Sequence, residues 1–402
     1  MRAAAKTISE KMRTVPLLRA LVPFVCGIVC ETFVEVPLTV WIVATAACAA
    51  TAILAQKHPS ISTLYTALAI LLFGATLARF HTPREVIPRG ERVWIELRID
   101  DNPSLSSSGR SFRTSGVALR WRREPEESAM AAGGRKEGHP AGNDWHPAGE
   151  KLIVGFDTMW RFEAGRTVVF RGYVNPIASG ETDSINNNTT SYSRLMSARG
   201  YSGRTYISKY SRPEVSPGKA KSLALFARKM QAAATARLRR LLSTHNEDAI
   251  AVAAAMTTGD RTGITPELKQ AYSRTGASHL LAVSGLHVGM VFLIINVLLY
   301  LLPLARHGHI AKNILAVVAI WLYASLTGLS PSATRAAFMF TGAQAALASS
   351  RSRSAVNIMC GTALVMLAVR PGLLFDISFQ LSFIAVAAIL AWFGPLYRLV
   401  ES

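Results

Sequence analysis

The sequence predicts a polytopic α-helical membrane protein with about eight spans and an inserted, extracytoplasmic small β-barrel domain. Three observations support this fold class. Half of the 402 residues are hydrophobic and 17% are charged, a smaller charged share than soluble domains have. Several apolar segments are long enough to cross a bilayer, and a polar stretch with strand-like alternation interrupts them. The net charge is nevertheless +19, which points to a basic surface outside the apolar segments.

Long apolar segments mark the membrane spans. We expect the short segments Ala336–Ser350 and Ala355–Val369 to lie inside a helix bundle rather than against lipid. The expected spans are Val15–Phe33, Val36–Ala55, Ile61–Ala78, Leu280–Leu304, Asn313–Leu329, Ala336–Ser350, Ala355–Val369 and Ile377–Tyr397. They form an N-terminal membrane module of three helices within residues 1–81 and a bundle of about five within residues 277–402.

The charges between the spans predict the orientation. The first 19 residues carry five cations and one acid, which places the N-terminus in the cytoplasm. The short loops that follow alternate between acidic and basic, as the positive-inside rule requires. We therefore expect a multi-pass protein of the cytoplasmic (inner) membrane, with its polar middle outside the cytoplasm.

The polar middle, residues 82–218, has the periodicity of strands. Apolar and polar side chains alternate in four short segments. These are Arg92–Ile99, Ser115–Trp121, Lys151–Phe156 and Thr167–Val174. Several short strands with few helical signals predict a small barrel, of which the oligonucleotide-binding (OB) barrel is one type. Residues 82–221 contain 22 Lys and Arg against 16 Asp and Glu, so this region is basic.

One cluster in the polar middle has the composition of a nucleic-acid surface. Arg120, Trp121, Arg122 and Arg123 place an aromatic ring among cations, the combination used by surfaces that bind single strands. The alternative is a strand end with solvated arginines.

Residues 219–276 predict a basic amphipathic helix and a re-entrant hairpin. Lys219–Ser243 has apolar residues along one helical face and cations, including Arg237 and Arg240, around the rest. Such a helix could lie on a membrane, border the path of an anion, or pack against the barrel. Ala249–Met256 is too short to span a bilayer, and with the helix after Thr265 it predicts a hairpin around Asp260.

Three polar motifs interrupt the later apolar segments. In RTGASHLLAVSGLHVG, residues 274–289, a helix would put Ser284 and His287 on one face and Gly285 and Gly289 four apart. The second motif, GLSPSATR, ends at Arg335, and the third, DISFQLS, contains Gln380 and Ser382. Polar groups at such depth usually face a bundle interior or an aqueous path.

These motifs closely resemble the ComEC/Rec2 family of competence proteins. GDRTGI followed by TGASHLLAVSGLHVG, then GLSPSATRAAFM and DISFQLSFIAV, match the family's blocks in order, and SYSRLMSARGYSGRTYIS resembles its N-terminal module. The resemblance implies a channel that imports single-stranded transforming DNA across the cytoplasmic membrane. It also implies as partners a DNA receptor, a cytoplasmic translocation ATPase and further copies of the chain. The family signature maps onto Ser284, Gly285, His287 and Gly289, without assigning a role to each.

The sequence departs from the family at one feature. Many members carry a C-terminal metallo-β-lactamase-like nuclease domain with an HxHxDH motif. His307 and His309 form an HxH here, but no Asp-His pair follows within the 402 residues. We therefore expect a transport protein rather than an enzyme, with no metal site and no cofactor, and the sequence is either a member without the nuclease or a fragment.

Two other function classes remain open at this point. A small-molecule transporter with an external binding domain would explain the spans but not the basic balance of the polar parts. An intramembrane serine hydrolase using Ser284 and His287 would need a third, orienting group and a different setting for the serine.

Overall fold

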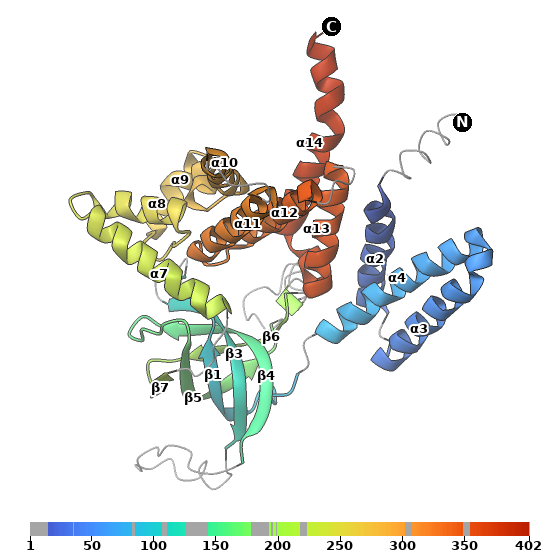
Figure 1. Cartoon of the computed structure of the whole chain (residues 1–402). Helices are drawn as coiled ribbons and strands as arrows, with labels where there is room; N and C mark the ends of the chain where they lie inside the picture. The colour runs from blue at the N-terminus through green and yellow to red at the C-terminus, as the bar shows by residue number, and fades with distance from the viewer. Residues whose placement is uncertain are drawn as a thin grey trace. The chain divides into compact units, whose positions relative to one another are not determined.

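The computed structural model describes residues 15–34, 36–82, 85–106, 111–124, 144–177, 193, 196–197, 199–217, 223–301, 308–348 and 354–401 (Figure 1). The chain divides into two compact units. The helical unit comprises Met1–Thr82, Gly285–Trp321 and Pro331–Ser402, and the sheet unit comprises Pro83–Ser284 and Leu322–Ser330. Residues 125–143 and the basic N-terminal residues before Val15 lie outside the described residues.

The helices of the helical unit begin and end close to the predicted spans. Their bounds are α2 Pro16–Phe33, α3 Leu38–Leu54, α4 Pro59–His81, α10 Gly285–Leu301, α11 Gly308–Leu326, α12 Pro331–Ala348, α13 Ala355–Val369 and α14 Ile377–Glu401. Short 3₁₀ turns, η1 Ala55–Lys57 and η3 Pro371–Phe375, precede α4 and α14. Among the described helices, four are long and apolar enough to cross a membrane, namely α2, the α3–η1 segment, α4 and α14. Three others, within α10, α11 and α13, are apolar but shorter.

Close packing of small residues joins α2 to α4. A Cβ atom on Gly27 would overlap the carbonyl oxygen of Leu71, and one on Gly74 would overlap that of Phe24. The two glycines therefore let the backbones touch, as small residues do where membrane helices cross closely. Phe24 and Ile28 of α2 also belong to a buried cluster with Ala363, Met366 and Leu367 of α13 and Phe379 of α14.

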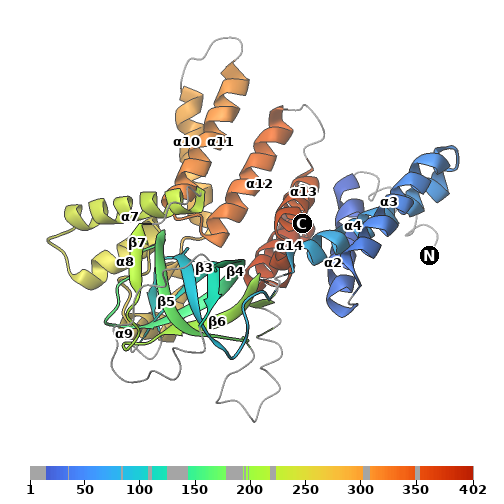
Figure 2. The ribbon, with the colours of Figure 1, turned by 90° about the horizontal axis from the view of Figure 1, so that it is seen from below.

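The sheet unit is built on a curved sheet with seven strands (Figure 2). The strands are β1 Arg92–Ile99, β2 Ser104–Leu105, β3 Ser111–Arg123, β4 His146–Asp157, β5 Arg166–Asn175, β6 Tyr201–Ile207 and β7 Glu214–Pro217. All four predicted strands are present, and β6, which was not predicted, completes the pairing. Five strands pair in the cycle β1–β3–β4–β6–β5–β1, in which only the β4–β6 pair is parallel.

The core of the sheet unit comes from the alternating inward positions of these strands. Val93, Ile95 and Leu97 of β1 are fully buried, as are Leu152 and Val154 of β4. Their outward neighbours are partly or fully exposed, so the alternation in the sequence corresponds to the two faces of the sheet.

A buried carboxylate anchors the segment that leads from α4 into this sheet. Glu150 of β4 is 3% exposed and accepts hydrogen bonds from the backbone N–H groups of Val86 and Ile87. The hydroxyl of Ser202 donates to its other oxygen at 2.7 Å, and the guanidinium of Arg89 lies at 2.8 Å from the same oxygen. Glu150 thus joins the entering chain to β4 and β6.

Three further helices belong to the sheet unit: α7 Leu223–Leu241, α8 Glu247–Thr257 and α9 Pro266–Arg274. The buried side of α7 differs from the predicted apolar face. Phe226 and Leu241 are 56% and 74% exposed, whereas Gln231 and Thr235 are buried. Besides carrying the apolar Leu225 and Ala227, the buried side of α7 meets the backbone carbonyl and the hydroxyl of Thr258, which the Gln231 amide and the Thr235 hydroxyl satisfy.

Candidate functional site

The sequence had predicted one continuous apolar helix from Leu280, but the signature segment 277–289 is broken before Gly285. It begins with a 3₁₀ turn, η2 Ala277–Leu281, continues through the non-helical residues 282–284, and becomes helical at Gly285. Ser284 therefore occupies the position just before α10, where serine is a favoured N-cap residue. His287 lies half-buried in the first turn of α10. Ser284 thus precedes the helix, and His287 lies three residues later within it.

The remainder of α10 packs on α12 through a series of side-chain contacts along the two helices. A Cβ on Gly289 would lie 3.5 Å from Cζ of Phe340, so the signature glycine leaves room for that ring. One turn further, Phe292 stacks on Phe340 with ring centroids 4.2 Å apart. The Gln344 amide then donates to Oδ1 of Asn296 at 3.2 Å. Gln344 is 4% exposed, and its Oε1 is buried with no hydrogen-bond partner.

Arg335, near the start of α12, is buried rather than placed at a lipid boundary. It is 6% exposed, and its Nη2 donates to the hydroxyl of Ser378 at 2.9 Å. Asp376 interacts electrostatically with the guanidinium and accepts the backbone N–H of Ser378 at 2.8 Å, which caps α14. The Nε of Arg335 is buried with no hydrogen-bond partner. A cation is thus held inside the helix bundle by an incomplete set of partners.

The polar pair predicted on α14 is less buried. Gln380 is exposed and donates to the carbonyl of Leu374 in the preceding 3₁₀ turn at 2.8 Å, and Ser382 is half-buried. The buried side chain of this turn is Phe379, at 4% exposed. Gln380 therefore links the start of α14 to the preceding 3₁₀ turn and does not face the interior of the bundle.

Two short helices, α8 and α9, flank Asp260 as predicted, and a side chain caps the start of each. Asn246 Oδ1 accepts the backbone N–H of Asp248 at the start of α8, and Thr265 Oγ1 accepts that of Leu268 at the start of α9. Between the helices, Asp260 Oδ1 accepts the backbone N–H and the hydroxyl of Thr262, at 3.0 and 2.8 Å. Asp260 thus closes a tight turn.

Gln231 of α7 connects the hairpin with the end of α11. Its Nε2 donates to the carbonyl of Thr258 at 2.7 Å, and its Oε1 accepts from Arg228 at 3.3 Å. A Cβ on Gly328 would lie only 2.2 Å from Gln231 Oε1. The hairpin motif and the GLSPS motif, far apart in sequence, therefore meet around one glutamine that sequence reasoning had not selected.

The GLSPS motif ends α11 with a specific backbone geometry. Gly328 and Leu329 both have positive φ, at 66° and 53°. The N–H of Leu329 bonds to the carbonyl of Ala324 and the N–H of Gly328 to that of Ser325, at 2.8 and 2.9 Å, which is the Schellman arrangement. Glycine at 328 suits both the left-handed backbone and the contact with Gln231.

The arginines nominated as DNA contacts on β3 are all in ion pairs. Arg120 lies 2.6 Å from Glu96 and 5.5 Å from the Trp145 ring, Arg122 lies 3.7 Å from Asp144, and Arg123 lies 2.9 Å from Glu91. Trp121 is half-buried; it packs against the buried core, and its ring centroid lies 5.1 Å from that of His146. The cluster is an ion-paired strand end.

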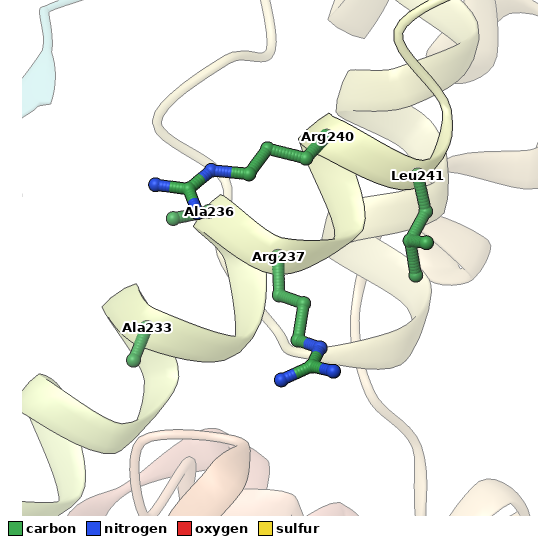
Figure 3. A pocket seen from close by; sticks show the side chains of 5 residues that line it. All are labelled: Ala233, Ala236, Arg237, Arg240 and Leu241. Carbon is green, nitrogen blue, oxygen red and sulfur yellow. The ribbon is translucent and has the colours of Figure 1, made fainter.

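Arg237 and Arg240 have a different setting. With Ala233, Ala236 and Leu241 they line a groove of about 490 Å³ along the outward side of α7, and both guanidinium groups extend away from the helix (Figure 3). No carboxylate of the described residues forms an ion pair with either arginine.

The structure therefore gathers the predicted residues into separate places rather than one site. Ser284, Gly285, His287 and Gly289 belong to the start of α10, Arg335 to the interior of the bundle, and Asp260 to the hairpin. Asn296, Gln344 and Gln231 were missed, although an isolated amide in an apolar or basic helix is a visible signal. Within the described ranges, no group of three His, Cys, Asp or Glu side chains is placed to hold a metal ion.

Comparison with known proteins agrees with the signature. A family model described as "Competence protein" matches residues 256–402. ComE operon protein 3 of Bacillus subtilis (strain 168) is 39% identical over 138 residues, which are 34% of this chain and 17% of the relative. The chain thus matches a small part of that relative's length. No solved structure matches.

The matched segment contains the hairpin after Met256, the signature segment and α10–α14, and the apolar helices give the protein a membrane location. On this evidence residues 256–402 are similar to the competence-protein family and to ComE operon protein 3, in agreement with the ComEC/Rec2 resemblance of the sequence motifs.

Proposed function

We propose that this protein forms a channel that imports single-stranded DNA across the cytoplasmic membrane during natural transformation. The observation that carries the proposal is the competence-domain match over residues 256–402, the segment in which Arg335, Asn296 and Gln344 are placed. Buried polar groups in membrane helices are costly unless they serve a path or a partner. The proposed orientation has a cytoplasmic N-terminus and an extracytoplasmic sheet unit.

The sheet unit is proposed to be an OB-like barrel that receives the strand. Support comes from the closed cycle of five pairings with one parallel pair, which corresponds to the strand order of a five-stranded Greek-key barrel. The proposed partners are single-stranded DNA, the surrounding lipid bilayer, a DNA receptor, a cytoplasmic translocation ATPase and other copies of this chain.

The chain itself is proposed to act without a catalytic step, cofactor or metal. The placement of Ser284 before α10 supports a capping role, and an N-cap substitution to alanine costs about 1 kcal/mol. Such a loss is compatible with continued transport, whereas the loss of a nucleophile is not compatible with hydrolysis.

Uptake of labelled DNA in a competent host tests the proposal. A strain without the gene is complemented with the wild-type chain, with His287→Ala or with Ser284→Ala, and nuclease-resistant label in the cytoplasm is measured. We expect no uptake without the gene, impaired uptake with His287→Ala at equal membrane insertion, and near-normal uptake with Ser284→Ala. Unchanged uptake in the deletion strain would contradict the channel, and loss only with Ser284→Ala would favour a hydrolase.

A further inference from the structure

The outward face of β4 and β6 differs from the ion-paired end of β3. Along β4, Leu152, Val154 and Phe156 are fully buried, so the alternate residues Ile153 and Gly155 face outward. In β6, Thr205 and Ile207 are buried and Tyr206 is 48% exposed. This face therefore belongs to the surface of the sheet unit, opposite its core.

The register of the parallel pair arranges aromatic rings and cations in rows. Lys151 is paired with Tyr201, and Gly155 is paired with Tyr206. The middle row joins Ile153 to Arg204, so β6 carries Tyr201, Arg204 and Tyr206 in succession along its length. On the other side of β4, Arg113 of β3 lies opposite Gly155.

The two rings are held in place by their neighbours. The ammonium of Lys151 lies 4.4 Å from the centroid of the Tyr201 ring. A Cβ on Gly155 would lie 2.7 Å from Cδ2 of Tyr206, so this ring lies across the bare backbone of β4. The Tyr206 hydroxyl donates to Asp157, whose other oxygen accepts the N–H of Lys209. A flat aromatic surface fixed from below and at its edge suits stacking of a base.

The charge of this face favours an anion. None of the ion pairs among the described residues involves Arg113, Lys151 or Arg204, in contrast to Arg120, Arg122 and Arg123. Asp157 is the acid of the face, and both of its oxygens already accept hydrogen bonds. Burial, together with the hydrogen bond to Asp157 and its charge, raises the pKa of Tyr206 to about 12, so the phenol adds no negative charge at neutral pH.

We propose that the β4–β6 face, with Lys151, Tyr201, Arg204 and Tyr206 and with Arg113 beside them, is the surface on which the sheet unit binds single-stranded nucleic acid. Unpaired cations take the phosphates and the tyrosine rings stack on bases, which a duplex does not expose. The inference rests on the proposed function, because it names the contact surface for the imported strand. It moves that surface away from Arg120–Arg123.

Binding of a labelled oligothymidylate of about 16 nucleotides to the purified full-length protein in detergent tests this surface. Tyr206→Leu should weaken binding roughly 5- to 150-fold, the range for loss of one base–aromatic stack. Tyr206→Phe keeps the ring and should bind like the wild type. The double change Lys151→Ala with Arg204→Ala should lower the slope of log K against log[salt] by about 1.4, since each single-strand phosphate contact contributes about 0.7.

Arg123→Ala is the matched control, because it removes an equally basic side chain that Glu91 already neutralises. It should leave both affinity and salt slope unchanged. If the wild type binds the strand and Arg123→Ala weakens binding while the Tyr206 and Lys151/Arg204 variants do not, the β4–β6 face is not the binding surface. If the wild type binds no single strand at all, the proposed import function loses its support as well. Thermal unfolding of each variant shows whether a loss of binding is a loss of fold.

Discussion

Two buried charged side chains, Glu150 in the sheet unit and Arg335 in the helical unit, are held in opposite ways. Glu150 accepts hydrogen bonds from two backbone N–H groups, a hydroxyl and a guanidinium. Arg335 donates to one hydroxyl and interacts with one nearby carboxylate, while its Nε has no partner. Both residues are less than one tenth exposed.

The number of satisfied hydrogen-bonding groups distinguishes a buried charge that stabilises the fold from one that does not. A buried ion whose hydrogen-bonding groups are all matched can stabilise the elements that supply the partners. A buried ion with an unmatched group carries a desolvation cost that the fold does not recover. Incomplete pairing alone does not assign a role, because Nε and Nη1 of Arg89 beside Glu150 are also buried without a hydrogen-bond partner. We expect Glu150 to stabilise the sheet unit, and we propose that Arg335 is retained for transport.

The largest expected effect is that of Glu150→Ala. The substitution leaves two backbone N–H groups and the buried guanidinium of Arg89 without their acceptor, so we expect the sheet unit to lose about 3–5 kcal/mol of stability. Thermal unfolding of the detergent-purified protein measures the change. Glu91→Ala, which breaks the exposed pair with Arg123, should lose less than about 1 kcal/mol. Equal unfolding temperatures for the two variants would remove the structural role of Glu150.

Arg335→Met should have a smaller effect on stability and a larger one on transport. Methionine fills most of the volume and removes the unmatched Nε, so we expect a loss of about 1–3 kcal/mol, from the hydrogen bond to Ser378 and its unpaired partner. DNA uptake should fall to near the level of the deletion strain at equal membrane insertion. Arg398→Met on α14, an exposed arginine, serves as the control. Normal uptake with Arg335→Met would show that incomplete pairing of this cation has no functional meaning.

The smallest effect is expected at the amide pair between α10 and α12. Interhelical hydrogen bonds in membranes contribute about 0.6 kcal/mol on average, so Gln344→Leu should change stability by less than about 1 kcal/mol. A double-mutant cycle with Asn296→Leu measures the coupling directly. A coupling free energy well above about 1.7 kcal/mol would show that the Asn296–Gln344 pair stabilises the fold, as Glu150 is expected to do.

The segments of regular structure were predictable because their signals are local. The span predicted at Ala355–Val369 is α13, and the strand predicted at Arg92–Ile99 is β1, each with its bounds unchanged. The helix expected after Thr265 begins at Pro266, and the Thr265 hydroxyl caps it. Apolar periodicity and capping chemistry act over a few neighbouring residues, so the order of residues is enough to reveal them.

Two predictions were wrong: the N-terminal boundary of α10 and the face of α7 that is buried. The apolar run through 280–304 concealed the break before Gly285, because hydropathy does not register a change of backbone conformation. On α7 the apolar side chains Phe226 and Leu241 stayed exposed, since Gln231 and Thr235 pack against the backbone carbonyl and the hydroxyl of Thr258 in the hairpin. Both outcomes depend on contacts between segments distant in sequence.

The sequence by itself determined that this is an apolar, basic membrane protein with an inserted domain of strands and the signature of a competence family. Composition, segment length and motif order carry that information without reference to any contact. Only the tertiary structure decided which cations are neutralised, which polar groups are buried, and which motifs meet at Gln231. Ion pairing and burial are properties of neighbours in space: the β4–β6 register places Lys151 beside Tyr201 and Arg204 beside Ile153, whereas Arg123 is paired with Glu91.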